Sequence, residues 1–435
     1  MSEGAKPSSP SDVVSGQIPI WMDNSFFQKA LREGGEDPQI EVVDSQVEEA
    51  LGKGENYVSI VYRALVKDGN GKEYHLIVKC LPSNEMRKKF ANKGNFFRKE
   101  IVMYTTVLPA FEKLKKTKEL TLPWAKHYYS FSDRDYDYLV MEDLKKKGFT
   151  MRERRKGLDR DHVEAAISAL AKYHAHSYAM KVTDPEAFNK FADQYPDTLY
   201  GEELKDLYPQ IVRNSYEQIA ESVRKWGGEK YDRIASKMED RKDTDFDAIF
   251  NLLAPIEPGA LLTHGDFWVN NMMFRYGNST EAETGSGKPL EVKLLDFQIV
   301  RYSSPAADLW YFVVTSVDTE TRRRYWRDLL ENAYLKSFWA TLECYGLCDK
   351  VPKGLFTMEW LQSEMHRLQR FGFISSVTVT PAVLAQSDDA PDMDSLTEED
   401  IKNPDFEFLK MGKEQLFLAR FKALVDDFDE NGLFD

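Results

Sequence analysis

The sequence predicts an α+β protein with two lobes: a small N-terminal lobe built on an antiparallel sheet with one key helix, and a larger, mostly helical C-terminal lobe. The chain has 435 residues, which exceeds the size at which a single hydrophobic core usually stops growing. β-rich runs are concentrated between residues 40 and 143 and enclose one long helical pattern. After residue 143 helical patterns dominate, so the two kinds of structure are segregated along the chain.

The composition is that of a folded, acidic protein. Apolar residues make up 42% of the chain and charged residues 30%, a balance typical of globular proteins. There are 72 acidic and 58 basic residues, which gives a net charge of -14 and argues against a nucleic acid as the main partner. The basic runs Lys145–Lys147 and Arg152–Lys156 are interpreted as solvated surface, with phosphate binding as a less favoured alternative.

The cysteines and the N-terminus indicate a cytoplasmic protein. Cys80, Cys344 and Cys348 are too few for a disulfide framework and lack the further ligands of a zinc site, so we expect buried free thiols in a reducing compartment. Residues 1–17 are polar, lack the apolar core of a signal peptide and are expected to be disordered. No run of about 18 apolar residues occurs, so we expect no membrane insertion.

The N-terminal lobe is expected to begin with a short amphipathic helix from Trp21 to Leu31. Two β-rich runs follow, Tyr57–Tyr62 and Tyr74–Val78, and residues 68–71 between them (Asp-Gly-Asn-Gly) are a strong hairpin signal. Phe96–Leu114 then carries apolar residues at helical spacing. This order predicts a small strand-rich segment that carries one helix.

Strand character returns over residues 121–143, and the next clear helix runs from about Asp161 to Ala179. Two polar insertions, Gly277–Pro289 and the acidic Ser387–Asp405, are expected to be solvent-exposed loops. His174 and His176 are two positions apart on the helix, so they cannot bind one metal together. We expect one of them in the core and the other exposed.

A polar loop at residues 264–271 (HGDFWVNN) carries the strongest chemical signal. Asp266 and Asn271 are five residues apart, so a loop can bring a carboxylate and an amide oxygen to one site. In phosphoryl transfer the carboxylate accepts the proton of the attacking hydroxyl, and the amide supplies a hard oxygen to Mg²⁺. By itself the pattern is only moderately specific, because an isolated Asp or Asn is more often a loop cap.

A second carboxylate strengthens this interpretation. Asp296 ends the strand-like run 292–295, which a Gly/Ser-rich insertion separates from the apolar residues 272–276. The two runs have the form of a β-hairpin. That hairpin would return Asp296 to a position beside Asn271.

The N-terminal lobe is expected to supply a lysine for the nucleotide phosphates. Lys79 ends a strand, and Glu100 lies on the packed stripe of the following helix, where a carboxylate is costly unless it meets a cation. A Lys79–Glu100 ion pair meets both requirements. Upstream, Gly52 and Gly54 would let the backbone approach a phosphate, although such glycines are as common in simple turns.

Together these residues resemble the protein-kinase-like fold, and more narrowly its ecdysteroid kinase-like branch, which is similar to choline kinases and aminoglycoside phosphotransferases. The resemblance spans roughly residues 40–345. The tryptophan and the doubled asparagine of the 264–271 loop are the features that resemble this branch most specifically. The stretches that carry it are residues 52–57 (GKGENY), Lys79, Glu100, residues 139–144 (LVMEDL), residues 170–175 (LAKYHA), the 264–271 loop and residues 295–298 (LDFQ).

The resemblance implies a role for each candidate residue. Asp266 would be the catalytic base, Asn271 and Asp296 would hold Mg²⁺, and Glu100 would orient Lys79 on the α- and β-phosphates of ATP. Residues 18–141 would form the N-lobe, 142–147 the hinge and 148–435 the C-lobe. The other implied site residues are Gly52, Gly54 and Asn56 at the phosphates, Met141, Glu142 and Leu144 at the adenine, and His264 and Asp308 as structural support of the catalytic loop.

The chain departs from ordinary protein kinases after Asp296-Phe297, where Gln298 replaces a glycine and no Ala-Pro-Glu segment follows. This departure favours small-molecule substrates over proteins. The resemblance implies an ATP-dependent kinase that phosphorylates a lipophilic alcohol such as an ecdysteroid or a related steroid or xenobiotic, with no obligate protein partner evident. Two alternatives remain open: a choline-, ethanolamine- or sugar-type kinase, and a catalytically silent ligand-binding protein.

Overall fold

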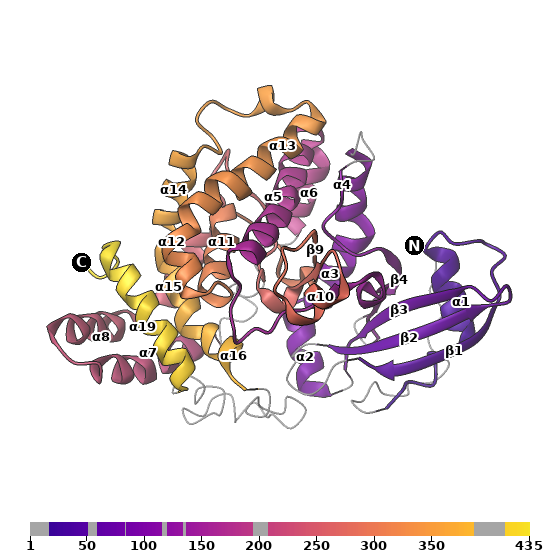
Figure 1. Cartoon of the computed structure of the whole chain (residues 1–435), viewed down its shortest axis with the longest axis horizontal. Coiled ribbons are helices and arrows are strands. Elements are labelled where there is room, and N and C mark those ends of the chain that lie inside the picture. Colours follow the sequence, from indigo (N-terminus) through magenta and orange to yellow (C-terminus); the bar gives the residue numbers. More distant parts are fainter. Residues whose placement is uncertain are drawn as a thin grey trace.

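The computed structural model has the predicted α+β architecture, with a sheet-containing lobe beside a larger helical lobe (Figure 1). Its described residues are 17–50, 59–82, 84–114, 120–133, 136–194, 208–386 and 414–435. Several predicted features lie outside them: Gly52, Gly54 and Asn56, nearly all of residues 1–17, and the acidic insertion Ser387–Asp405.

The N-terminal lobe contains a five-stranded sheet in the order β1-β2-β3-β5-β4, with every neighbouring pair antiparallel. The predicted hairpin at residues 68–71 is confirmed, because the Asp68 carboxylate accepts hydrogen bonds from the backbone N–H groups of Asn70 (2.9 Å) and Lys72 (2.8 Å). The strands are β1 (Val42–Glu49), β2 (Ile60–Asp68), β3 (Glu73–Cys80), β4 (His127–Phe131) and β5 (Tyr138–Glu142).

Two helical segments flank this sheet. The predicted first helix is α1 (Asn24–Glu33), which begins where the Asp23 carboxylate accepts a hydrogen bond from the backbone N–H of Phe26 (2.9 Å). The predicted helix over residues 96–114 is continuous but contains one π-helical turn, an insertion frequent at functional sites. Its parts are α3 (Phe96–Val102), η1 (Met103–Val107) and α4 (Leu108–Leu114), preceded by α2 (Glu85–Lys93).

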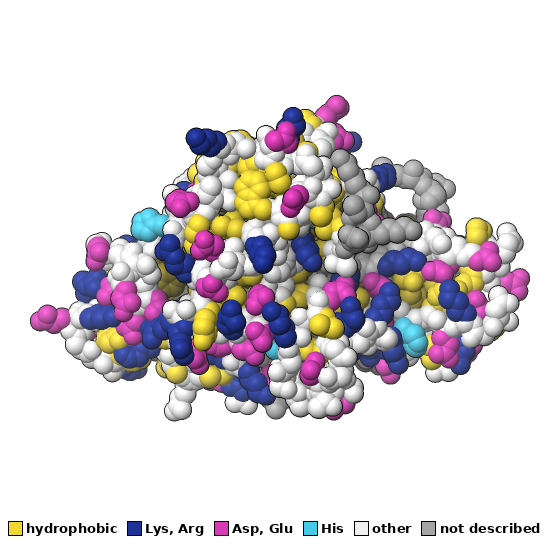
Figure 2. Space-filling model, turned by 45° about the horizontal axis from the view of Figure 1, so that its top comes forward, with side chains coloured by type: hydrophobic (Ala, Val, Ile, Leu, Met, Phe, Trp, Pro, Cys, Tyr) yellow, Lys and Arg dark blue, Asp and Glu magenta, His cyan; other side chains and the backbone are white. Residues whose placement is uncertain are grey.

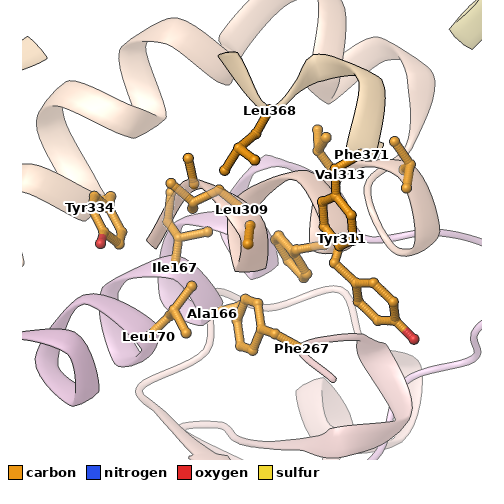
Figure 3. Packing of buried hydrophobic residues seen from close by; sticks show 14 of the residues in the cluster. Ala166, Ile167, Leu170, Phe267, Leu309, Tyr311, Val313, Tyr334, Leu368 and Phe371 are labelled. Atoms are coloured by element: carbon orange, nitrogen blue, oxygen red, sulfur yellow. The ribbon is translucent and has the colours of Figure 1, made fainter. Parts of the chain in front are cut away.

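The C-terminal lobe is organised around α5 (Arg160–Thr183), which is buried along most of its length. A helix that is apolar nearly all round belongs inside a large core, and Figure 3 shows Ile167 and Leu170 of α5 facing Leu309. The helices around it are α6 (Pro185–Gln194), α7 (Tyr208–Arg224), α8 (Glu229–Arg241), α9 (Asp245–Leu253), α11 (Pro305–Thr315), α12 (Thr319–Leu329), η6 (Leu330–Leu335), α13 (Lys336–Tyr345), α14 (Met358–Arg367), α15 (Gln369–Thr378), α16 (Thr380–Leu384) and α19 (Gln415–Glu430).

Two small sheets lie within this lobe and position the polar loops. One pairs β7 with β10, and the other has the order β6-β8-β9. Short 3₁₀ turns connect them to the rest of the lobe. The elements are β6 (Phe149–Thr150), β7 (Leu261–Thr263), β8 (Met272–Arg275), β9 (Glu291–Leu294) and β10 (Arg301–Ser303), with the turns η2 (Leu144–Lys147), η4 (Val269–Asn271), η5 (Phe297–Ile299) and η7 (Cys348–Lys350).

Some local predictions are wrong. The insertion Gly277–Pro289 contains a short exposed helix, α10 (Ser279–Thr284), because the Asn278 side chain caps it. Cys344 and Cys348 are exposed, and only Cys80 is buried. His174 and His176 are both fully buried, since α5 is covered on both of the faces that they occupy.

The basic run Arg152–Lys156 is also not simply solvated. Arg154 donates to the backbone carbonyls of Ala382 and Val383 (both 2.6 Å), and Arg155 donates to the carbonyl of Leu384 (2.8 Å). These carbonyls lie at the C-terminus of α16, where helix carbonyls lack partners within the helix. The two arginines therefore connect the segment before α5 to the C-terminus of α16.

The face of the molecule in Figure 2 is of mixed charge. Figure 2 shows Lys and Arg side chains interspersed with Asp and Glu over the face in view. None of the helices that the structure describes combines the length and the apolar character needed to cross a bilayer.

Candidate active site

The 264–271 loop connects β7 to β8, and its backbone is held by Asp308. The backbone N–H groups of His264 and Gly265 donate to the two oxygens of the Asp308 carboxylate, at 2.6 and 2.8 Å. Gly265 has φ +83°, and a Cβ there would lie 1.9 Å from the carbonyl oxygen of Ile299. Only glycine fits this close approach. His264 itself contacts the carbonyl oxygen of Leu295 through Nε2 (3.0 Å).

Asp308 belongs to a fully buried hydrogen-bond network. His174 Nε2 lies 3.1 Å from Asp308 Oδ2, and His174 Nδ1 lies 2.8 Å from the Tyr334 hydroxyl. Burial alone would raise the pKa of Asp308, but the hydrogen bonds and charge of its partners hold that pKa below its usual value. The carboxylate is therefore kept ionised as a structural brace.

Asp266 lies at the centre of the loop and receives two side-chain hydrogen bonds. Asn271 Nδ2 donates to Oδ2 (2.8 Å), and the Tyr311 hydroxyl donates to Oδ1 (2.7 Å). Burial and the neighbouring Asp296 carboxylate raise the pKa of Asp266 to about 6, against the effect of these two hydrogen bonds. A carboxylate with a pKa near neutrality suits a general base.

The structure brings Asp296 to this loop through the β8–β9 hairpin. Met272 pairs with Leu294 in that hairpin, and the backbone N–H of Leu295 donates to the carbonyl of Asn271 (2.9 Å). Asp296 follows directly, with φ +64°, a left-handed conformation uncommon for a residue with a side chain. Such strain is often found at functional sites.

Lys79 connects the two lobes. Its Nζ lies 2.7 Å from Glu100 Oε2 and 3.1 Å from Asp296 Oδ1. Gln298 Nε2 also donates to Glu100 Oε2 (3.3 Å), so the residue that replaces the protein-kinase glycine helps to hold this carboxylate. Burial raises the pKa of Glu100 against the attraction of Lys79. The expected Lys79–Glu100 pair is thus formed and extends to Asp296.

The predicted hinge residues lie beside Lys79. Met141 pairs with Ile77 and Leu139 pairs with Lys79, so strand alternation places all four side chains on one face of the sheet. The Glu142 carboxylate accepts a hydrogen bond from the backbone N–H of Lys126 (2.8 Å) and pairs with Lys147.

The backbone N–H of Glu142 also donates to the carbonyl of Lys126 (3.0 Å). Leu144 is buried at the start of η2.

A stack of aromatic rings runs from the sheet to the 264–271 loop. His127 stacks on Tyr104 (ring centroids 6.2 Å apart), the rings of Tyr104 and Phe297 form a T-shaped contact (5.8 Å), and Phe297 contacts His264 (4.8 Å). Phe297 directly follows Asp296, so this stack connects the helix of residues 96–114 to the predicted metal ligand. Sequence reasoning placed Tyr104 only on a packing stripe and gave no role to His127.

The donor set fits Mg²⁺. The Nδ2 group of Asn271 donates to both the carboxylate and the backbone carbonyl of Asp266 (2.9 Å), so its Oδ1 is directed away from Asp266. That oxygen and the Asp296 carboxylate are hard ligands, and Mg²⁺ characteristically takes its other ligands from water and phosphates. Within the described ranges, no group of three or more His, Cys, Asp or Glu residues forms a metal site by itself.

Comparison with known proteins gives one family. The profile of the ecdysteroid kinase-like family matches residues 53–347, which include every described site residue discussed above. No curated protein matches the chain.

Two solved structures align over most of their length. An aminoglycoside phosphotransferase from Streptomyces rimosus, in complex with ADP and streptomycin, is 12% identical; the alignment covers 81% of this chain and 99% of that one, with a TM-score of 0.29. A kinase domain is 10% identical, with 84% and 95% covered and a TM-score of 0.22. Similarity this low says nothing about ligands.

Proposed function

The chain belongs to the ecdysteroid kinase-like family, and from this we propose that it is an ATP-dependent kinase of small molecules that phosphorylates a hydroxyl group. The observation that carries the proposal is one continuous polar chain across the lobes. Glu100 binds Lys79, Lys79 binds Asp296, and the hairpin holds Asp296 beside the Asp266–Asn271 pair. Phosphoryl transfer depends on this combination of cation, metal ligands and base.

In the proposed reaction Asp266 accepts the proton of the acceptor hydroxyl. The acceptor oxygen bonds to the γ-phosphorus as the bond from that phosphorus to ADP breaks. Asn271 and Asp296 would hold Mg²⁺, which supplies charge neutralisation at the phosphates when bound. Lys79, fixed by Glu100, would contact the α- and β-phosphates.

The remaining predicted positions complete the proposal. Residues 18–141 and 148–435 would close on the nucleotide about the hinge 142–147. The adenine would meet the backbone of the segment from Met141 to Leu144, and the glycine-containing residues 52–56 would cover the phosphates. We propose a cytoplasmic site of action.

The proposed acceptor is a lipophilic alcohol such as an ecdysteroid or a related steroid or xenobiotic, which is what family membership suggests. A phosphate adds up to about two negative charges, so such a product no longer crosses membranes easily. The complete set of Lys79, Glu100, Asp266, Asn271 and Asp296 favours an active enzyme over a silent binding protein.

The test is a panel of sterols, ecdysteroids, choline, ethanolamine and sugars incubated with Mg-ATP, with phosphorylated products detected by mass spectrometry. We expect turnover of a lipophilic alcohol. Asp266→Asn should lower kcat about 10²- to 10⁴-fold, because the general base is lost. Its melting temperature should be unchanged or higher, because a buried charge is removed. A wild type that neither binds Mg-ATP nor converts any acceptor would rule out the enzyme. Turnover of choline or a sugar alone would retain the kinase and replace the acceptor class.

A further inference from the structure

Tyr311 is the least expected neighbour of the proposed base. It lies on α11 and is buried, with 6% of the residue exposed. Figure 3 shows its ring at the edge of the apolar cluster, with the hydroxyl directed away from the other labelled side chains. That hydroxyl donates to Asp266 Oδ1 at 2.7 Å. The ring thus packs in the apolar cluster, while the hydroxyl contacts the proposed base.

The two oxygens of Asp266 are held from two different elements. Asn271 holds Oδ2 from within the loop, on the side of the predicted metal ligands, whereas Tyr311 holds Oδ1 from α11. A carboxylate anchored at both oxygens cannot rotate about its Cβ–Cγ bond without breaking a hydrogen bond. Each carboxylate oxygen has two acceptor positions, so Oδ1 retains one for an incoming hydroxyl.

The same helix also fixes the loop backbone. Asp308 and Tyr311 are three residues apart, which places them on one face of α11. Asp308 holds the backbone N–H groups of His264 and Gly265, and Tyr311 holds the side chain of Asp266. One rigid helix therefore sets both the position of the loop and the orientation of its carboxylate.

We propose that Tyr311 is a positioning residue that orients Asp266 Oδ1 toward the acceptor hydroxyl, on the opposite side of the carboxylate from Asn271. This inference rests on the proposed kinase function. The proton of the acceptor passes to Asp266, the acceptor oxygen bonds to the γ-phosphorus, and ADP departs. Tyr311 keeps its own proton throughout, so it acts through Asp266 and not on the substrate.

The test compares Tyr311→Phe with a matched control, Tyr216→Phe. Tyr216 is also a buried tyrosine whose hydroxyl donates to a buried carboxylate, that of Asp245, but it lies on α7 in a separate network. With Mg-ATP and the best acceptor of the panel, Tyr311→Phe should lower kcat about 10- to 100-fold while the KM for ATP and the affinity for Mg-ADP stay within twofold. The control should keep both kcat and KM.

A double-mutant cycle separates positioning from simple structural support. If Tyr311 acts through Asp266, Tyr311→Phe costs nothing further in an Asp266→Asn background. A kcat within twofold of wild type for the single variant, or an equal loss in both backgrounds, would overturn the inference.

A readout independent of turnover keeps the two proposals distinguishable. In a crystal structure of Tyr311→Phe we expect the Asp266 carboxylate to be rotated or spread over several orientations. If the wild type is active and this carboxylate is unmoved, the role of Tyr311 fails while the kinase proposal stands. If the wild type converts no acceptor, the kinase proposal fails, and an unmoved carboxylate would reject the positioning role as well.

Discussion

The two ends of the aromatic stack differ in how their polar atoms are satisfied. At the end near the 264–271 loop, Asp308 and His174 are fully buried and make hydrogen bonds to the loop, to each other and to Tyr334. At the sheet end, Glu100 Oε1, the Tyr104 hydroxyl and His127 Nε2 are buried without a hydrogen-bond partner in the described part of the chain.

A satisfied network stabilises the native state, whereas each unpaired buried group costs about 1–3 kcal/mol. The hydrogen-bond network at the loop end therefore favours a single geometry of the 264–271 loop. The sheet end carries a free-energy cost, because the contacts from the other lobe, Asp296 with Lys79 and Gln298 with Glu100 Oε2, do not reach these three unpaired atoms.

The largest expected effect is at the satisfied end. Asp308→Ala removes the acceptor for two buried backbone N–H groups and for His174, and should lower the free energy of unfolding by about 3–5 kcal/mol. Chemical denaturation followed by circular dichroism measures this loss. Asp308→Asn retains one acceptor oxygen and should lose less. An Asp308→Ala variant as stable as the wild type would show that the loop is held by other contacts.

The next effect is a pH dependence at the unsatisfied end. Burial lowers the pKa of His127 to about 4, below its unfolded value of about 6.5. The unfolded chain therefore binds the proton more readily, so stability is full above about pH 6.5 and falls as the pH drops toward 4. Because His127 is partly exposed, we expect a loss of about 1–3 kcal/mol over this window.

Denaturation curves at several pH values measure this loss, and in His127→Leu the decline between pH 6.5 and 4 should be smaller. The exposed His366 on α14 offers a matched control: His366→Leu should keep the wild-type profile. Identical profiles for wild type and His127→Leu would show that His127 does not cause the pH dependence of stability.

The sequence predicts the features of this site that depend on local backbone structure. The Gly/Ser insertion between two apolar runs was enough to predict the hairpin that brings Asp296 to Asn271. The position of Glu100 on a packed stripe was enough to predict its pairing with Lys79. Both inferences use local periodicity, which the sequence displays directly.

The contacts that were missed depend on how distant elements pack. Tyr311 reaches Asp266 across 45 positions, and nothing in the local pattern of α11 distinguishes its hydroxyl from an ordinary core tyrosine. The stacking of His127 on Tyr104 requires the position of β4 relative to the π-helical turn. The expectation that one of His174 and His176 is exposed is wrong, because helical spacing shows that the two occupy different faces but not that both faces are covered.

The smallest expected effect gives the most direct comparison, because the same substitution, tyrosine to phenylalanine, is made near both ends of the aromatic stack. Tyr334 and Tyr104 are each almost fully buried, but the Tyr334 hydroxyl meets His174 Nδ1, whereas the Tyr104 hydroxyl has no partner among the described residues. Tyr334→Phe leaves a buried ring nitrogen unpaired and should destabilise the protein by about 1–2 kcal/mol.

Tyr104→Phe removes a group that is costly to bury and should be neutral or stabilising by up to about 1 kcal/mol. Both rings keep their packing, so differential scanning calorimetry of the two variants reads the hydroxyl alone. Equal losses would mean that the Tyr104 hydroxyl is paired in solution, and the distinction between a satisfied and an unsatisfied end of the stack would then disappear.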